Sequence, residues 1–443
     1  MKGVVIAGTG SGVGKTSITT GILSRLSKDY RVQAFKAGPD FIDPMYHTLA
    51  SGRRSRNLDS FMMDDDTIRN IVGYASKDAD ICIVEGVRGL YEGFSAESDV
   101  GSTARLAKAL GFPVVLTIDV RSLNRSVAAI VNGFAAFDSE VNIKGLILNN
   151  ISGSQHETKL DEVMGRYCEQ EVIGKVRKMS ERPTKERYLG LVTPNAKERP
   201  DIAPFYEMAE GVDLDRLMEI AESSHTELPQ ECPYVRRETG LSAAIPIDDS
   251  FCFYYRENIE CLEASGVRIK EFAPTEGESL PDADIYYMGG GYPELHAEDI
   301  SSNTDFLEGI RNASEEGKPI LGECGGLLSM CRTLKDSNGR LHKMAGIFDA
   351  RAEMTGIRHG PTYVMAEATP ANPLFTSEVR AHEYHYSDVF LEHGAKLGYS
   401  LSRGAGIADG MDGLVRKSTL GTYMHQHALS TGDWASGFIS RCV

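Results

Sequence analysis

Short apolar runs alternate with longer amphipathic segments along the first half of the chain. This alternation predicts helices at residues 15–29 and 102–111. It also predicts buried strands at residues 2–8, 31–38, 81–86, 113–120 and 143–150. Strands that alternate with helices are typical of a doubly wound parallel sheet, which binds its ligands beyond the carboxyl ends of the strands.

A second series of strands follows a break in this pattern. Periodicity decays after residues 212–224, and the next stretch, HTELPQECPYVRRETG, has two prolines and mixed charge, as linkers often do. Strand patterns resume at residues 241–248, 266–274, 282–291 and 318–326. We therefore expect an α/β protein of two doubly wound domains, at residues 1–225 and 241–443, with a linker at 226–240.

Composition narrows the class of protein. A chain of 443 residues suits two domains, and 41% hydrophobic with 25% charged residues is usual for a soluble protein. No apolar run approaches the roughly 18 residues of a membrane span, so we expect a cytoplasmic protein without membrane contact. A net charge of −16 argues against binding nucleic acid. The eight cysteines form no C-x-x-C pair, which suggests neither a zinc site nor a disulfide framework.

The stretch GTGSGVGKTS, residues 8–17, predicts a phosphate-binding loop because it follows a strand and opens a helix. Backbone N–H groups would hold phosphate oxygens, Lys15 would neutralise them, and the Thr16 hydroxyl would ligate Mg²⁺. The first glycine of the motif is Gly8 rather than residue 9. This shifted form resembles the dethiobiotin synthetase branch of P-loop ATPases.

Acidic side chains are expected where the neighbouring strands end. FKAGPDFIDPMYH supplies Asp40 and Asp43 after the second strand, and IVEGVRGLYEG supplies Glu85 at the end of the third. We predict Asp40 and Glu85 as Mg²⁺ ligands beside Thr16, while Asp43 either positions the substrate or holds the loop. The arginines of SGRRSR, residues 51–56, are either an anion site or a solvated loop.

A cysteine between a strand and a helix marks the second candidate site. Cys324 in PILGECGGLLSM has three glycines around it, a pattern that predicts a sharp turn with an exposed sulfur and a thiolate favoured by the helix N-terminus. GTYMHQHAL near the carboxyl end offers His425 and His427 as candidate bases. The glycine turn of YYMGGGYPE, residues 286–294, would supply N–H groups to an oxyanion hole.

Together these motifs resemble the cobyrinate a,c-diamide synthase family, including its archaeal members that act on nickel-sirohydrochlorin. The second domain resembles the class I glutamine amidotransferases of the cobyric acid synthase type. The matching segments span nearly the whole chain: GTGSGVGKTS, FKAGPDFIDPMYH, RNLD, VEGVRGLYEG, RYLGLV, FCFYYRENIECLEASG, MGGGYPE, GECGGLL, HEYHYS and YMHQH.

The resemblance implies a role for each matching residue. Cys324 would be the glutaminase nucleophile and His425 its base, with Gly290, Gly291 and Gly325 at the oxyanion and glutamine. Many related glutaminases carry Glu two residues beyond that histidine, where His427 stands here, so a Cys–His dyad is expected. The nucleotide would contact Gly12, Gly14, Lys15, Thr16, Ser17, Lys36 and Asn149. The macrocyclic substrate would contact Asp43, His47, Arg54 and Arg88.

The implied reaction uses ATP, Mg²⁺ and L-glutamine to convert the a and c acetates of a carboxylated tetrapyrrole into amides through an acyl phosphate. Arg88 and RHGPTYV, residues 358–364, favour nickel-sirohydrochlorin, on the way to the nickel-tetrapyrrole coenzyme of methanogenesis, over cobyrinate and cobalamin. Whether the protein forms a homodimer is left open by the resemblance. A partition-type switch ATPase with a docking pseudo-glutaminase is the alternative, disfavoured by Gly10 where such switches place a second lysine.

Overall fold

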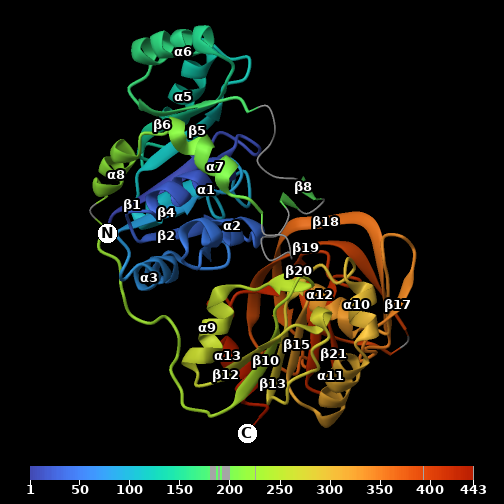
Figure 1. Cartoon of the computed structure of the whole chain (residues 1–443). Coiled ribbons are helices and arrows are strands. Elements are labelled where there is room, and N and C mark those ends of the chain that lie inside the picture. The colour runs from blue at the N-terminus through green and yellow to red at the C-terminus, as the bar shows by residue number, and fades with distance from the viewer. Residues whose placement is uncertain (180–185, 188–189, 192–199, 225, 393, 443) are drawn as a thin grey trace. The chain divides into compact units, whose positions relative to one another are not determined.

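The computed structural model describes residues 1–179, 186–187, 190–191, 200–224, 226–392 and 394–442. Contacts divide the chain into two compact units, Met1–Pro233 and Tyr234–Val443, each built around its own sheet (Figure 1). Residues 188, 189 and 192 of the RYLGLV segment lie outside the described residues. In the described part of the chain, no helix has the length and apolar character needed to cross a bilayer.

The first unit is organised by a seven-stranded parallel sheet in the order β3-β2-β4-β1-β5-β6-β7. All five strands predicted for this half are present. The sheet also contains two strands that were not predicted, the short β3 and β7 at its edge. The strands are β1 (Gly3–Gly8), β2 (Val32–Ala37), β3 (Arg56–Leu58), β4 (Ile81–Glu85), β5 (Val114–Asp119), β6 (Ile143–Ile151) and β7 (Glu171–Arg177). The central strands β1, β2 and β4 are buried along their whole length, which explains their continuous apolar runs.

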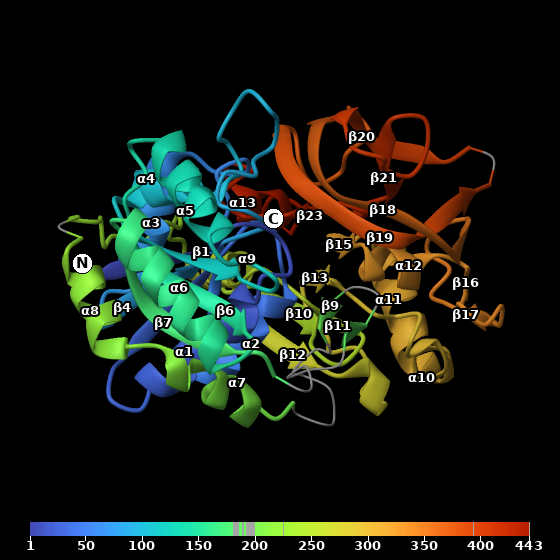
Figure 2. The same cartoon turned by 90° about the horizontal axis from the view of Figure 1, so that it is seen from above.

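Helices of the first unit bury apolar side chains against this sheet. A core cluster joins β1, β2 and β4 to α1 (Lys15–Leu26) and α8 (Leu214–Glu222), for example through Ile18, Ile22 and Leu217. The remaining elements are α2 (Ile42–Ser51), α3 (Asp65–Ala75), α4 (Thr103–Leu110), α5 (Ser126–Phe137), α6 (Ser154–Tyr167), α7 (Ala203–Met208), the 3₁₀ turn η1 (Ala209–Gly211), and the short β8 (Glu186–Arg187) and β9 (Gly190–Leu191). Figure 2 shows the same elements seen from above.

The second unit combines a parallel and an antiparallel half in one 12-stranded sheet. The parallel half has the order β12-β10-β13-β15-β22, with β10 (Ser242–Pro246), β12 (Arg268–Phe272), β13 (Ile285–Met288), β15 (Ile320–Glu323) and β22 (Thr419–Thr422). Its helices are α9 (Arg256–Ala264), α10 (Ala297–Ser302), α11 (Thr304–Glu316), α12 (Gly325–Met330) and α13 (Trp434–Ile439), with the 3₁₀ turn η2 (Pro274–Glu276). The predicted α/β fold is confirmed, with strands at all four positions expected in this half.

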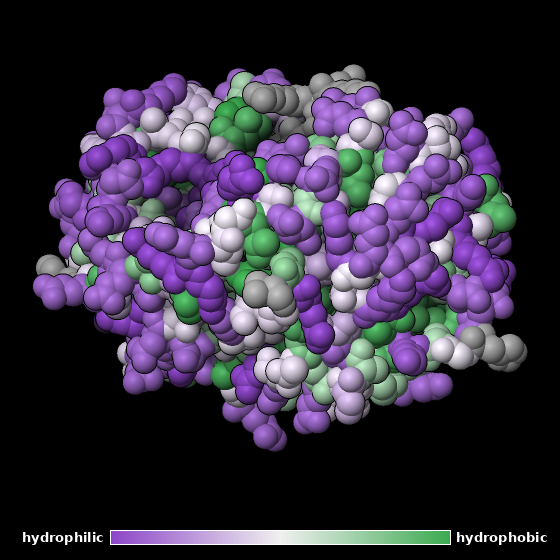
Figure 3. Space-filling model, turned by 90° about the horizontal axis from the view of Figure 1, so that it is seen from below, coloured by the Kyte–Doolittle hydropathy of each residue, from purple (hydrophilic) through white to green (hydrophobic). Residues whose placement is uncertain are grey.

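The antiparallel half is built on two long strands, β18 (Ala350–Ala368) and β19 (Glu378–Leu391), which pair along most of their length. It continues through β20 (Lys396–Arg403) and β21 (Met411–Arg416), and β16 (Thr333–Lys335) and β17 (Leu341–Lys343) lie at its edge. The two-residue β23 (His425–Gln426) pairs with β19, while β11 (Phe251–Phe253) pairs with β14 (Gly290–Gly291). Figure 3 shows a face on which hydrophilic residues predominate and hydrophobic ones form smaller groups.

Candidate active sites

The phosphate loop joins β1 to α1 and is shaped by left-handed glycines. Gly12 and Gly14 have φ of 74° and 95°, a region that side chains other than glycine rarely adopt. A Cβ on Gly14 would also lie 2.3 Å from Nδ2 of Asn149. That Asn149 amide donates to the carbonyl of Val13 at 2.8 Å, and its Oδ1 accepts from its neighbour's N–H. Asn149 therefore braces the loop from β6, and Ser17 follows in the first turn of α1.

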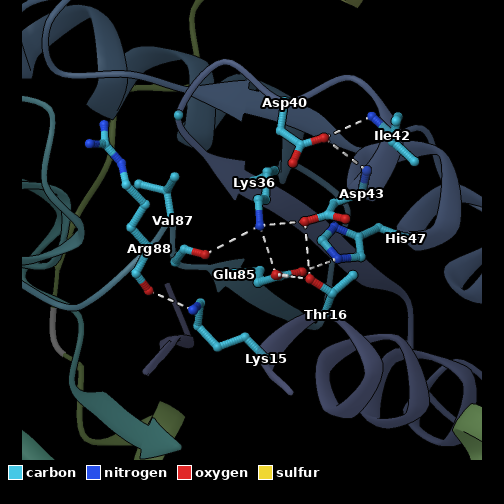
Figure 4. Close-up of polar contacts among 12 residues, drawn as sticks. Lys15, Thr16, Lys36, Asp40, Ile42, Asp43, His47, Glu85, Val87 and Arg88 are labelled. Carbon is cyan, nitrogen blue, oxygen red and sulfur yellow. Dashed lines mark hydrogen bonds and ion pairs between the residues drawn. The ribbon is translucent and has the colours of Figure 1, made fainter. Parts of the chain in front are cut away.

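Four side chains converge on Thr16 at the carboxyl ends of β2 and β4 (Figure 4). The Thr16 hydroxyl is 3.0 Å from Oδ2 of Asp43 and 2.7 Å from Oε1 of Glu85. Lys36 Nζ lies between the same two carboxylates, at 2.6 and 2.7 Å. His47 Nε2 is 2.6 Å from the other Glu85 oxygen. We call Thr16, Lys36, Asp43, His47 and Glu85 the acidic cluster.

The charged groups of the acidic cluster shift one another's pKa values. Burial would lower the pKa of Lys36, but Asp43 and Glu85 outweigh it and hold the pKa above its ordinary value. Burial, with the Asp40 charge next, raises the pKa of Asp43 to about 7 against the pull of Lys36. Burial also opposes ionisation of Glu85, yet Lys36 and His47 bring its pKa well below the usual range. Lys36 and Glu85 are therefore an ion pair at neutral pH.

Lys15 lies in the same site, and no carboxylate of the described residues lies at its ammonium. Its Nζ donates to the carbonyls of Gly10 at 2.8 Å and Arg88 at 2.5 Å. Burial, followed by the charge of Lys36, lowers the pKa of Lys15 to about 8. Two lysines that repel each other beside a glycine loop would be stabilised by a polyanion, since phosphate charge would offset both.

Several predicted residues occupy different places from those expected. Asp43, rather than Asp40, reaches Thr16, because Oδ1 of Asp40 accepts from the N–H groups of Ile42 and Asp43 and holds the start of α2. His47 is 0% exposed behind Glu85, and its Nε2 lies at that carboxylate.

The two arginines predicted for the substrate have exposed side chains. Arg54 is exposed in the SGRRSR loop, where its neighbour Arg53 pairs with Asp78 at 2.8 Å. Arg88 has φ of 48°, its carbonyl accepts from Lys15, and its side chain points away from the acidic cluster (Figure 4). Only the backbone of Arg88 therefore takes part in the phosphate-loop site.

Cys324 lies on the turn between β15 and α12 in a strained conformation, with φ of 47° and ψ of −99°. Adjacent glycines allow this turn to pack tightly. A Cβ on Gly326 would lie 2.3 Å from the carbonyl of Met288, and one on Gly322 would lie 2.5 Å from the Met330 methyl group. The Cys324 N–H donates to the Thr422 carbonyl at 2.7 Å, which extends the β15–β22 pairing. The predicted strand–turn–helix geometry is present.

The other residues predicted for this site gather around the turn. A Cβ on Gly290 would lie 2.4 Å from Cε1 of His425, and one on Gly325 would lie 3.2 Å from the Gly291 nitrogen. His425 also stacks on His382, its partner in the β19–β23 pairing, with ring centroids 4.9 Å apart. His425, Gly290, Gly291 and Gly325 thus lie close together, from three separate segments of the chain.

The electrostatics of this site differ from the expectation of an exposed thiolate. Cys324 is 8% exposed, and burial, with Glu294 next, raises the pKa of its thiol to about 12. Burial lowers the pKa of His425 to about 3. The short α12, six residues long, does not offset the burial. The expectation of an exposed, ionised cysteine was wrong, because the 286–294 and 421–427 segments lie close to the turn; the resting pair is a neutral thiol and a neutral imidazole.

Asp412, on β21, was missed by the sequence reasoning. It is fully buried, and burial raises its pKa to about 6. Its carboxylate accepts from the Thr422 hydroxyl at 2.5 Å and from the N–H of Tyr423 at 3.2 Å, which fixes the turn that leads to His425. An isolated aspartate in a strand carries no motif, so nothing in the sequence pointed to it.

Comparisons with known proteins match a domain family in each of the two units. Residues 4–188 match the CobQ/CobB/MinD/ParA nucleotide binding domain, and residues 242–432 match the CobB/CobQ-like glutamine amidotransferase domain. A protein of Methanothermobacter thermautotrophicus named cobyrinate a,c-diamide synthase is 43% identical over 98% of this chain and 98% of its own. One of Methanosphaera stadtmanae with the same name is 40% identical over 99% and 98%.

Among solved structures, a crystal structure of a glutamine amidotransferase is similar with a TM-score of 0.34 and 14% identity, covering 45% of this chain and 98% of that one. The full-length relatives and the two domain matches make the assignment. The chain belongs to the cobyrinate a,c-diamide synthase family.

Proposed function

We propose that this protein amidates the a and c acetate side chains of a carboxylated tetrapyrrole, with glutamine as nitrogen donor and ATP as activator. The observation that carries the proposal is the presence of two complementary sites in one chain. One is a phosphate loop with paired lysines and carboxylates, and the other is a cysteine on a strained turn beside a histidine. Full-length relatives named for this reaction support it.

The first half-reaction would take place at the phosphate loop, which we assign to residues 1–225. An acetate oxygen of the substrate attacks the γ-phosphorus of ATP, and the bond to the β-phosphate oxygen breaks. The products are ADP and an acyl phosphate on the substrate. Lys15, the loop N–H groups and Lys36 would hold the phosphates and the charge that moves onto the leaving oxygen. The acyl phosphate gives the substrate carbonyl a leaving group that ammonia can displace.

The acidic cluster has the oxygen donors that Mg²⁺ requires. In the described part of the chain, no group of three or more His, Cys, Asp and Glu side chains is arranged to hold a metal by itself. Mg²⁺ in nucleotide sites typically takes one or two carboxylates and completes its shell with phosphate oxygens and water. Thr16, Glu85 and Asp43 fit that pattern, with Asp40 holding the turn below them. When bound, Mg²⁺ would offset the negative charge of the phosphates.

The second half-reaction would release ammonia in the domain we assign to residues 241–443, beyond a linker at 226–240. Cys324 Sγ bonds to the side-chain carbonyl carbon of glutamine while His425 accepts the thiol proton. His425 then returns that proton to the departing nitrogen, and ammonia is released. The thioester that remains on Cys324 is hydrolysed by water to give glutamate. The N–H groups around Gly290, Gly291 and Gly325 would stabilise the oxyanion.

A neutral resting pair is compatible with this step. Because burial keeps both the Cys324 thiol and the His425 imidazole uncharged, proton transfer would accompany attack on glutamine rather than precede it. The thiol would then stay unreactive toward other electrophiles until glutamine arrives.

Two macrocycles are candidates for the acceptor. The relatives are named for cobyrinate, whereas Arg88 and the RHGPTYV segment favour nickel-sirohydrochlorin. The exposed Arg88 side chain, on a loop whose backbone holds Lys15, is available to an extra substrate carboxylate. We therefore propose nickel-sirohydrochlorin as the preferred substrate and cobyrinate as the alternative.

The test is to incubate the protein with ATP, Mg²⁺, glutamine and each macrocycle in turn, and to follow the products by mass spectrometry. We expect a diamide from nickel-sirohydrochlorin, formed faster than any diamide from cobyrinate, with ADP release that depends on the macrocycle. Faster conversion of cobyrinate would reverse the order of the two substrates. ADP release without amide formation from either would favour a switch ATPase and contradict the proposed function.

A further inference from the structure

A buried carboxylate stands directly before the nucleophile. Glu323 is the last residue of β15, next to Cys324 in the chain, and is 1% exposed. Its Oε2 lies 3.9 Å from Nδ1 of His425. The residue that precedes the cysteine and the histidine that would deprotonate it are therefore neighbours in space, although 102 positions separate Glu323 from His425 in the sequence.

Hydrogen bonds hold the Glu323 carboxylate in one orientation. The N–H of Gln426, adjacent to His425, donates to Oε1 at 3.0 Å. The Tyr287 hydroxyl donates to Oε2 at 2.9 Å, and it accepts from Nδ2 of Asn258 at 2.9 Å, so its own proton is directed to Glu323. Both carboxyl oxygens accept hydrogen bonds, which holds Oε2 on the side of the His425 ring.

His427 occupies the position where related glutaminases carry their third residue, and it belongs to a different cluster. Its Nε2 lies 3.5 Å from Oε2 of Glu257, and its ring packs edge-on against Tyr255 at 4.9 Å between centroids. His427 and Glu257 are both 0% exposed. His427 is thus placed to hold Glu257 inside the second unit.

We propose that Glu323 is the third member of the glutaminase site, a positioning residue that acts on Cys324 through His425. This inference rests on the glutaminase half of the proposed function. With its Nδ1–H directed at Glu323, the His425 ring presents the lone pair of Nε2 as the base for the Cys324 thiol. After the proton has moved, the carboxylate stabilises the imidazolium that forms.

The separation of 3.9 Å is longer than a hydrogen bond, and catalytic contacts of this kind tighten when substrate binds. Burial raises the pKa of Glu323 to about 8 despite the opposing effect of its two hydrogen-bond donors, so the ionised form is not favoured while His425 is neutral. A positive charge on His425 would attract the carboxylate, and this attraction arises only as the thiol attacks glutamine, which is when it lowers the barrier.

The test compares two variants, Glu323→Gln and the matched control Glu257→Gln. Both replace a buried glutamate that lies near a histidine. The first readout is glutamate release from glutamine by the full-length protein with ATP and macrocycle present. For Glu323→Gln we expect kcat to fall on the order of 100-fold with KM within about threefold, because ring orientation matters mainly in the transition state. Glu257→Gln should stay within about threefold in kcat.

The second readout needs no macrocycle and therefore separates this inference from the proposed function. The rate at which iodoacetamide alkylates Cys324, followed on its peptide by mass spectrometry, should fall with Glu323→Gln and not with Glu257→Gln. Glu323→Asp, which keeps the charge on a shorter arm, should recover part of both kcat and alkylation rate, and it replaces Glu323→Gln if that variant does not fold.

Unchanged kcat and alkylation in a folded Glu323 variant would overturn the inference. So would a larger loss from Glu257→Gln, which would assign the role to the His427–Glu257 pair. If the wild-type protein amidates neither macrocycle, the proposed function fails while the alkylation rates still decide the role of Glu323.

Discussion

The two candidate sites of this chain differ in their resting charge. Around Thr16, a buried lysine and two carboxylates form ion pairs at 2.6 and 2.7 Å, and the ammonium of a second lysine, Lys15, donates to backbone carbonyls. Around Cys324, burial keeps the thiol and the imidazole neutral, with pKa values of about 12 and about 3. The site around Thr16 is therefore charged before its ligands bind, whereas the site around Cys324 is neutral.

This difference follows from what each site is proposed to bind. ATP with Mg²⁺ carries charge into the phosphate loop, so fixed ions there can attract and orient it. Glutamine brings no net charge to its reacting amide, and a permanent thiolate beside it would be open to oxidation and alkylation. The comparison predicts that charge-removing substitutions act strongly at the first site, and that geometry decides the second.

The largest effect at the charged site is expected from Lys15→Ala. Removal of its ammonium leaves the phosphates without a main counter-charge, so synthesis from glutamine and from ammonium salt should both fall on the order of 100-fold or more. Steady-state rates with each nitrogen source measure this. Lys28→Ala, an exposed lysine just beyond the far end of α1, is the control and should change little. Near-normal synthesis from ammonium in Lys15→Ala would place ATP elsewhere.

A smaller effect, on the Mg²⁺ requirement, is expected to distinguish Asp43 and Glu85 from Asp40. Asp43→Asn and Glu85→Gln should each raise the Mg²⁺ concentration needed for half-maximal rate about tenfold or more. The reason is that a carboxylate oxygen of each residue accepts a hydrogen bond from the Thr16 hydroxyl. Asp40→Asn keeps the Oδ1 acceptor that holds α2, so its shift should be clearly smaller. Titrations of rate against Mg²⁺, with melting temperature as the folding control, give the order. Equal shifts in all three variants would restore Asp40 as a ligand.

The local parts of both sites could be predicted from sequence, because they depend on neighbouring residues. Gly12 and Gly14 take left-handed conformations in a strand–loop–helix, and Cys324 takes a strained one flanked by glycines, as the motifs indicate. Most predicted strands are continuous apolar runs because they are buried on both faces. The long β18 alternates poorly and is exposed in its middle, so no comparable pattern predicted the antiparallel half of the second sheet.

What could not be predicted depends on segments distant in the chain. The direction of Asp43 toward Thr16 is decided by the turn that Asp40 holds, not by spacing alone. The contact between Glu323 and His425 exists only after β15 and β23 are placed in one unit. The burial of Cys324, which reversed the expected ionisation, likewise comes from residues about 30 and 100 positions away.

The central claim is that ammonia made at Cys324 is used at an ATP-activated carboxylate. Cys324→Ser tests it directly, with glutamine carrying heavy nitrogen in its side-chain amide, unlabelled ammonium salt in parallel reactions, and mass spectrometry of the macrocycle. Cys331→Ser, a buried cysteine just beyond α12, is the matched control and should behave as wild type. We predict that the wild-type product carries two heavy nitrogens, and that Cys324→Ser loses glutamine-dependent synthesis on the order of 1000-fold while keeping most ammonium-dependent synthesis. Loss of both activities in folded Cys324→Ser, or heavy nitrogen in its product at the wild-type rate, would contradict the account.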